Sequence, residues 1–165
     1  MNTTYAGFWL RFVAYIIDAI IIYIVQSFVF IPLFAVFGLS FASQLDGAAT
    51  MDEAQAMGMV ASMMGMAMSS MLLGLAISVA YYSAMETSKF QGTVGKIALG
   101  LVVTDTDGNK LTIGKAIVRN LCKIISGFIL FIGYIMAGFT EKKQGLHDII
   151  AGTLVVKKAS ATAQV

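Results

Sequence analysis

The chain has 165 residues, of which 58% are hydrophobic and 12% are charged, and its formal net charge is +2. A soluble globular protein carries about 25% charged residues, so this deficit indicates an integral membrane protein. The small net charge excludes a strongly basic nucleic-acid-binding surface. The single cysteine, Cys122, excludes an internal disulfide. The length predicts one domain over residues 1–165.

Residues 9–31 form the first long apolar stretch, and two charged residues, Arg11 and Asp18, lie inside it. About 20 apolar residues cross the hydrocarbon core of a bilayer, so the stretch predicts a transmembrane helix. It is too long for the apolar region of a signal peptide, which has about 7–15 residues. A charge at membrane depth costs about 2.5–3.5 kcal/mol on insertion scales and usually faces the protein interior or a water-filled cavity. This pair is therefore the best functional lead in the sequence.

The end of the first helix is open, because Pro32 can kink or end a helix while the apolar run continues to Phe41. Residues 42–56 are small, polar and acidic and predict a loop, and residues 57–85 predict a second span. The methionines of this second span fit adaptable packing better than a Cu(I) site, because no Cys or His accompanies them. No metal site and no cofactor are predicted. Small residues at four-residue spacing allow close helix contact there: Ala61, Gly65 and Ser69, and Ser70, Gly74 and Ser78.

Basic residues are concentrated after the second span. No Lys or Arg lies between Arg11 and Lys89, whereas six lie from Lys89 to Lys123. The positive-inside rule therefore predicts that residues 86–123 are cytoplasmic, that the N-terminus is also inside, and that the acidic loop is outside.

The region 86–123 also predicts a small β element. Asp107-Gly108 between two apolar runs is a strong hairpin signal, with strands near 98–104 and 110–113. Residues 114–123 have helical spacing, with an apolar and a basic face, and predict an amphipathic helix at the membrane surface. Residues 152–158 in the tail predict a third strand, which resembles the first.

Residues 124–139 are the third apolar segment, followed by a tail over residues 140–165. Two alternatives are open. If the strands at 98–104 and 152–158 pair, the segment must enter the membrane and return on the same side. A simple span would put the basic residues of the tail outside, which the positive-inside rule disfavours.

The charged residues need partners. Arg11 and Asp18 share a helix face but lie about 10 Å apart along the axis, too far for a short ion pair. Asp18 therefore needs a partner from another segment, a proton or a bound cation. Asp148 is a candidate partner of Arg11 or Arg119. His147, the only histidine, cannot form a zinc site alone; a surface or capping role is favoured over a pH-sensing role.

Four segments together resemble the RDD family of small integral membrane proteins: GFWLRFVAYIIDAIII at 7–22, TVGKIALGLVVTD at 93–105, LTIGKAIVRN at 111–120 and KKQGLHDIIAGTLVV at 142–156. The family is named for an arginine and two aspartates, which fall here on Arg11, Asp18 and Asp148. Gly145 stands where many members carry an arginine. The resemblance implies transport, including cation/proton exchange, as suspected for some bacterial members, or assembly with larger membrane complexes, as for some eukaryotic relatives.

The fold predicted is an all-α multi-pass protein of the cell membrane. It has two transmembrane helices, a third apolar helical segment that is either re-entrant or a simple span, and a small cytoplasmic β-hairpin or three-stranded element. No catalytic spacing is present, so no enzyme is predicted. The favoured function is a transporter or cation/proton-exchange component, and the alternative is a scaffold or accessory subunit. Asp18 and Asp148 are the candidate ion or proton sites, within a charge network with Arg11 and Arg119. The predicted partners are the lipid bilayer, a second copy or another membrane protein, and monovalent cations or protons, without nucleic acid.

Overall fold

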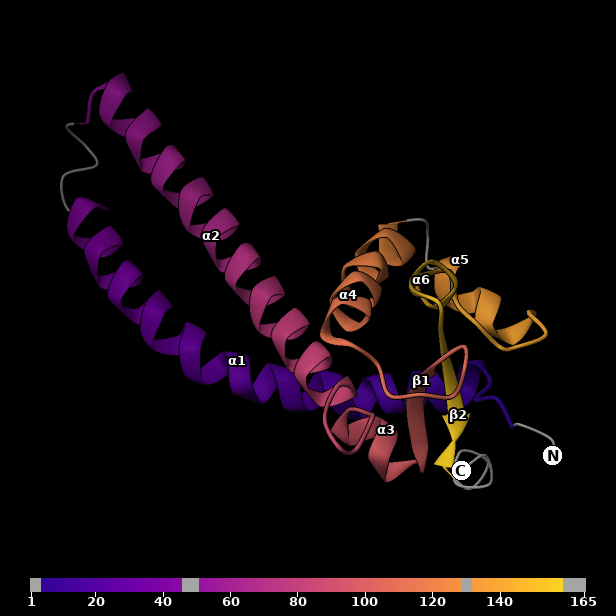
Figure 1. The fold of residues 1–165 in the computed structure, drawn as a ribbon. Coiled ribbons are helices and arrows are strands. Elements are labelled where there is room, and N and C mark those ends of the chain that lie inside the picture. Colours follow the sequence, from indigo (N-terminus) through magenta and orange to yellow (C-terminus); the bar gives the residue numbers. More distant parts are fainter. Residues whose placement is uncertain (1–3, 46–50, 129–131, 159–165) are drawn as a thin grey trace. The chain divides into compact units, whose positions relative to one another are not determined.

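The structure is a computed structural model and describes residues 4–45, 51–128 and 132–158 (Figure 1). It is mostly helical, with two long apolar helices and a two-stranded antiparallel sheet. The chain forms two compact units, one from residues 1–20 and 78–165 and the other from residues 21–77.

The two long helices are α1 (Phe8–Leu45) and α2 (Glu53–Glu86), and each contributes to both units. Both are long and apolar enough to cross a membrane, so the two predicted spans are present as helices. Helix α1 continues through Pro32, because proline removes only one backbone hydrogen bond and apolar residues flank it on both sides.

The predicted loop at 42–56 was too long at both ends. Helix α1 continues to Leu45, and α2 already begins at Glu53. The start of α2 is fixed by a reciprocal cap, in which the Gln55 N–H donates to Asp52 Oδ1 (2.8 Å) and the Asp52 N–H donates to Gln55 Oε1 (3.0 Å). Part of the loop, residues 46–50, lies outside the described residues.

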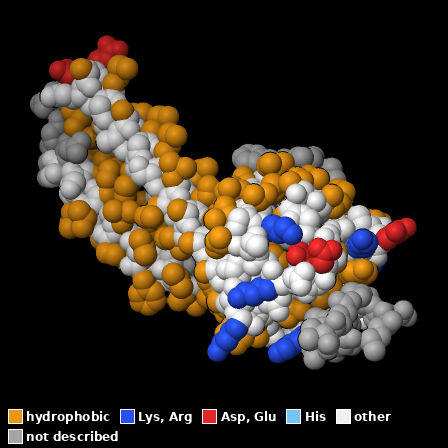
Figure 2. Space-filling view, in the orientation of Figure 1, with side chains coloured by type: hydrophobic (Ala, Val, Ile, Leu, Met, Phe, Trp, Pro, Cys, Tyr) orange, Lys and Arg blue, Asp and Glu red, His pale blue; other side chains and the backbone are white. Residues whose placement is uncertain are grey.

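The unit of residues 21–77 presents an apolar surface. Figure 2 shows hydrophobic side chains over the visible face of both long helices. A partly buried contact links them, because the Gln26 side chain donates to the Gly74 carbonyl (2.9 Å) and the Phe30 ring lies against Gly74. Large exposed apolar surfaces of this kind are typical of lipid contact. The most exposed of its large hydrophobic side chains are Tyr23, Phe28, Ile31, Val36, Leu39, Met57, Met68 and Met71.

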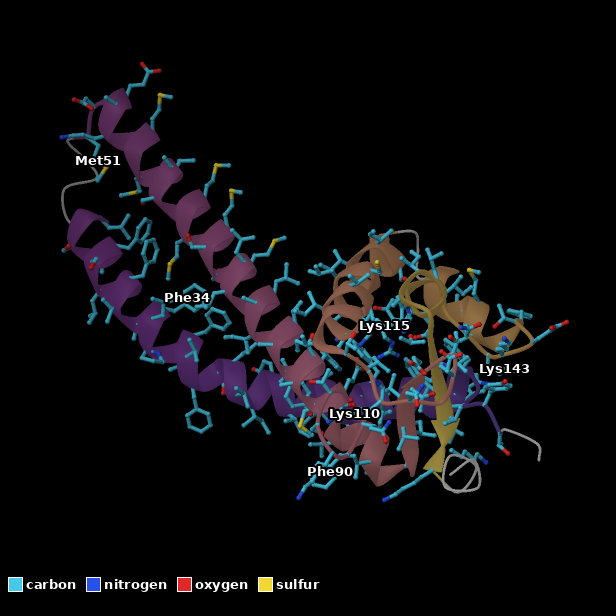
Figure 3. All side chains as sticks on the ribbon, viewed as in Figure 1. Phe34, Met51, Phe90, Lys110, Lys115 and Lys143 are labelled. Carbon is cyan, nitrogen blue, oxygen red and sulfur yellow. The ribbon has the colours of Figure 1, made fainter. Side chains whose placement is uncertain are left out.

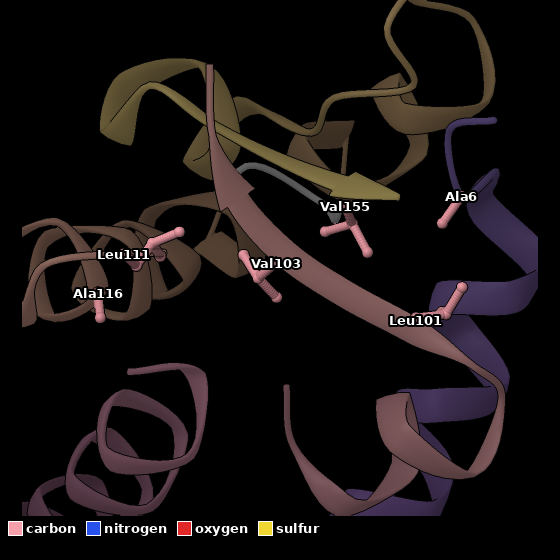
Figure 4. Packing of buried hydrophobic residues seen from close by; sticks show 6 residues of the cluster. All are labelled: Ala6, Leu101, Val103, Leu111, Ala116 and Val155. Atoms are coloured by element: carbon pink, nitrogen blue, oxygen red, sulfur yellow. The ribbon is translucent and has the colours of Figure 1, made fainter. Parts of the chain in front are cut away.

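The sheet pairs β1 (Leu101–Asp105) with β2 (Thr153–Lys157) in antiparallel orientation, so the pairing that the sequence left open occurs. The two strands are apolar on both faces because both faces are covered. On one face lies a core cluster of Ala6, Leu101, Val103, Leu111, Ala116 and Val155 (Figure 4). On the other face, Val102, Leu154 and Val156 pack with Tyr5.

The predicted β-hairpin was wrong. The turn at Asp107-Gly108 forms, and Asp105 Oδ1 accepts the N–H groups of Asp107 (3.0 Å) and Asn109 (2.8 Å). Only one bridge follows, between Thr104 and Lys110, because helix α4 (Ile113–Phe128) begins where the second strand was expected. Lys110 and Lys115, labelled in Figure 3, are exposed on either side of this helix start.

The third apolar segment is not one straight helix. Helix α4 extends beyond the predicted 114–123 and includes the first residues of the third apolar segment. Helix α5 (Ile132–Ile135) and the 3₁₀ turn η2 (Met136–Gly138) contain its later residues. The chain has reversed by then, since the Tyr134 hydroxyl donates to the Lys123 carbonyl (3.1 Å). Gly133 permits this return, because an added Cβ there would lie 2.7 Å from the side chain of Ser126. Lys123 and Tyr134 therefore lie side by side, and the strands before and after this segment pair with each other.

Candidate functional site

Asp148 joins two arginines that are distant in the sequence. It lies in α6 (Leu146–Ala151), which packs against α4. Its Oδ1 accepts from Arg119 Nε (2.8 Å), and its Oδ2 pairs with Arg11 Nη1. Asp148 is fully buried, and the Gly145 N–H also donates to Oδ2 (3.2 Å). The N-terminal helix, α4 and α6 are therefore held together by one carboxylate.

Glu86, at the end of α2, is the second buried carboxylate of this cluster. Its Oε1 pairs with Arg119 Nη1, with Lys96 Nζ (2.5 Å) and with Lys123 Nζ (3.8 Å). Its Oε2 accepts from the Asn120 side chain (3.3 Å). We call Arg11, Glu86, Lys96, Arg119, Lys123 and Asp148 the buried charge network.

The environment of the network shifts the pKa of its members. Burial by itself raises the pKa of Asp148, but Arg119 and Arg11 outweigh burial and hold it well below its ordinary value, so Asp148 stays ionised at neutral pH. Burial, opposed by Glu86, lowers the pKa of Lys123 to about 7. Burial likewise lowers the pKa of Lys96.

Asp18 does not belong to the network. None of the ion pairs found in the described part of the chain includes Asp18. Its Oδ1 accepts from the Tyr81 hydroxyl (3.1 Å) and the Gly95 N–H (2.8 Å), and its Oδ2 accepts from the Thr93 hydroxyl (2.5 Å). Only 1% of Asp18 is exposed, and the hydrogen bonds that it accepts come from two hydroxyl groups and a backbone N–H.

His147 is buried, so the favoured surface role was wrong. Its Nδ1 lies 3.3 Å from the Ser126 hydroxyl, and its ring lies 5.0 Å from that of Tyr134. Burial lowers the pKa of His147 to about 3, and the nearby carboxylate of Asp148 only partly opposes this. The imidazole is therefore neutral at physiological pH, which argues against a pH-sensing role.

A cavity of about 310 Å³ opens beside these residues, within the unit of residues 1–20 and 78–165. Its charged lining consists of Arg11, Asp18, Lys96, Arg119 and Lys123, and the neutral His147 also lines it. Aromatic side chains, among them Phe12, Tyr15 and Tyr82, cover much of the remaining wall. In the described residues no group of three or more His, Cys, Asp or Glu side chains could hold a metal ion.

Sequence reasoning singled out Arg11, Asp18, Arg119 and Asp148. The structure joins Arg11 and Arg119 through Asp148, whereas Asp18 lies outside this network and accepts a hydrogen bond from the Gly95 N–H. It missed Glu86, Lys96 and Lys123. A signal for Glu86 was present, because it is the one carboxylate between Glu53 and Asp105 and closes an apolar span before a basic region.

Comparison with known proteins gives the family. The RDD family model matches residues 5–152. The uncharacterized protein YxaI of Bacillus subtilis (strain 168) is 42% identical over 153 residues, which cover 93% of this chain and 97% of the relative. The uncharacterized membrane protein YteJ of the same organism is 32% identical over 159 residues, 94% of this chain and 83% of the relative. No solved structure matches the chain. With two candidate spans and a match over nearly its whole length, the chain belongs to the RDD family of membrane proteins.

Proposed function

We propose that this protein is a component of a membrane transport or ion-exchange system, not an enzyme, and that Asp18 carries the proton or cation. The observation that carries the proposal is that a buried carboxylate lines a cavity of about 310 Å³. The hydrogen bonds that Asp18 accepts come from neutral groups, so a cation bound there would not have to displace a basic partner. Asp148 is a weaker candidate, since two arginines keep it ionised.

Transport by this chain calls for more than one copy. Secondary transporters commonly bind their substrates between structural repeats, and the described residues of one copy contain two candidate spans. A homo-oligomer, or a complex with another membrane protein, would complete the pathway.

The scaffold function is the second candidate, and the buried charge network favours it. Arg11, Glu86, Arg119 and Asp148 link four helices through ion pairs. A protein whose charges serve only to hold helices in place would need such links and no moving ion.

Replacing Asp18 by asparagine separates the two candidates. In proteoliposomes with imposed pH, Na⁺ or K⁺ gradients, the parent should move protons in exchange for a cation, and Asp18→Asn should abolish that flux, because the amide keeps the shape but cannot ionise. The control is Asp105→Asn, which changes a carboxylate beside the exposed β1–α4 loop. Equal flux in Asp18→Asn and parent would show that Asp18 is not the carrier. Absence of flux in the parent under every gradient would favour the scaffold.

The proposed topology puts the N-terminus, residues 86–123 and the tail in the cytoplasm, and the α1–α2 loop outside. In a Cys122→Ala background, an impermeant maleimide added to intact cells should label Asp52→Cys, while Lys110→Cys and Lys142→Cys should be labelled only after lysis. All three positions are exposed, so access to solvent is matched. Labelling of Lys142→Cys from outside would restore a simple span for the third segment.

A further inference from the structure

The cavity wall is unevenly charged. Four cationic side chains line it, those of Arg11, Lys96, Arg119 and Lys123, against the single carboxylate of Asp18. The carboxylates of Glu86 and Asp148, which pair with these cations, are not among the lining residues and are fully buried. The cations therefore stand between the cavity and the carboxylates that balance them. Such a wall can offer cationic charge partners to the acid group of a ligand.

Asp18 does not neutralise the wall by pairing. Both of its oxygens already accept hydrogen bonds, from Tyr81, Thr93 and Gly95. None of these donors is a cation, so Asp18 does not form an ion pair with the positive charges of the wall.

Arg11 supplies an unsatisfied donor. Its Nε donates to the Ala6 carbonyl (2.9 Å), and its Nη1 pairs with Asp148. Its Nη2 is buried and has no acceptor among the described residues. A buried donor without a partner costs about 1–3 kcal/mol, and more when it is charged. An oxygen of an acid placed in the cavity would remove that cost.

Lys123 is the second cation available to a ligand. Its Nζ lies 4.1 Å from the centre of the Tyr82 ring and donates to Asn120 Oδ1 (2.6 Å). Its nearest carboxylate oxygen, Glu86 Oε1, is 3.8 Å away and is shared with Arg119 and Lys96. The Lys123 ammonium is thus weakly paired compared with the other cations of the network.

We propose that the cavity binds an acid group, a carboxylate or a phosphate, carried on an apolar body, with Arg11 and Lys123 as its charge partners. The apolar body would lie against the aromatic wall, which includes Phe12, Tyr15 and Tyr134. A volume of about 310 Å³ is at the lower end of small-molecule sites, so it suits a headgroup or a small organic acid. This binding activity goes beyond the proposed transport function, because a scaffold could bind the same ligand.

The acid should bind more tightly at low pH. The pKa of Lys123 is lowered to about 7, so Lys123 is cationic below pH 7 and neutral above it. His147, with a pKa of about 3, and Asp148, with a pKa well below its ordinary value, do not change charge in this range. Affinity should therefore fall as the pH rises through about 7. The charged and titratable groups around Lys123 are Tyr82 and Glu86 on α2, Lys96 on α3 (Val94–Ala98), Arg119 on α4, Tyr134 on α5, His147 and Asp148 on α6, and Arg11 and Asp18 on α1.

Binding can be measured with the full-length protein in nanodiscs of zwitterionic lipid. Radiolabelled dodecanoate should bind saturably, and its methyl ester, which has no charge, should not compete. Competition by hexanoate at similar affinity would indicate a soluble organic acid as the ligand class, and competition only by long-chain acids would indicate a lipid-borne acid. Competition by inorganic phosphate as strong as that by dodecanoate would show that the apolar body contributes nothing, and would overturn the proposal.

Arg11→Gln and Lys123→Gln should each weaken dodecanoate binding at least about tenfold, the loss expected for one hydrogen bond to a charged group. The matched control is Lys142→Gln, which removes an exposed charge and should bind like the parent. If Arg11→Gln fails to fold because Asp148 loses a partner, Lys123→Gln decides, since its lysine is the more weakly paired. The Lys123→Gln variant should also lose the fall in affinity near pH 7. Equal competition by the methyl ester, absence of saturable binding, or parental affinity in Lys123→Gln would overturn the proposal.

Discussion

Replacing Glu86 by alanine should destabilise the folded protein by about 3–5 kcal/mol, the loss found when one partner of a buried ion pair is removed. The reason is geometric, because a single carboxylate pairs with Arg119, Lys96 and Lys123 and is fully buried. Without it, three cations would remain in a low-dielectric site. The expected result is a lower Tm and less monodisperse protein in detergent, measured by size-exclusion chromatography after heating.

Two further variants make the Glu86 experiment specific. Glu141→Ala removes an exposed carboxylate and should leave the Tm unchanged. Adding Lys96→Gln to Glu86→Gln removes one cation together with its partner, so the double variant should be more stable than Glu86→Gln alone. A Tm for Glu86→Ala equal to that of Glu141→Ala would mean that the cluster contributes nothing to stability.

The two long helices could be predicted because hydrophobicity over about 20 residues is a property of the sequence alone. The pairing of β1 with β2 could also be anticipated from the sequence as one alternative, since both segments are short, apolar and flanked by turns. The hairpin failed because a local signal was overruled by tertiary packing: Leu111 enters the core, and the Thr112 hydroxyl accepts the Lys115 N–H (3.4 Å) at the start of α4.

The candidate site could be predicted in part from the sequence, for the same physical reasons. A charge inside an apolar run is visible in the sequence, and this singled out Arg11 and Asp18. The partners of Asp18 were not visible, because a backbone N–H and two hydroxyl groups leave no distinctive mark in a sequence. Glu86 was overlooked because its role depends on three basic residues that only the fold brings together.

Among substitutions near Asp18 that add one methyl group, Gly95→Ala should lower the Tm most. The added Cβ would overlap the carbonyl oxygen of Ala14 and lie 3.1 Å from Cγ of Asp18. Neither neighbour is the flexible end of a long side chain, so α3 would have to move away from α1, and the Gly95 N–H would lose its 2.8 Å hydrogen bond to Asp18. Overpacking of this kind costs about 1–3 kcal/mol, and the loss of the buried hydrogen bond adds to it. The Tm in detergent measures the effect.

Gly114→Ala is the matched control, because it makes the same substitution where the structure has open space. Gly114 is exposed near the start of α4, and nothing described lies within 4 Å of its added Cβ. Alanine favours helix over glycine by up to about 1 kcal/mol, so this variant should be as stable as the parent or slightly more stable. If Gly95→Ala also keeps the parental Tm, then α1 and α3 are not in tight contact there, and the hydrogen bonds that hold Asp18 beside the cavity would have to be reconsidered.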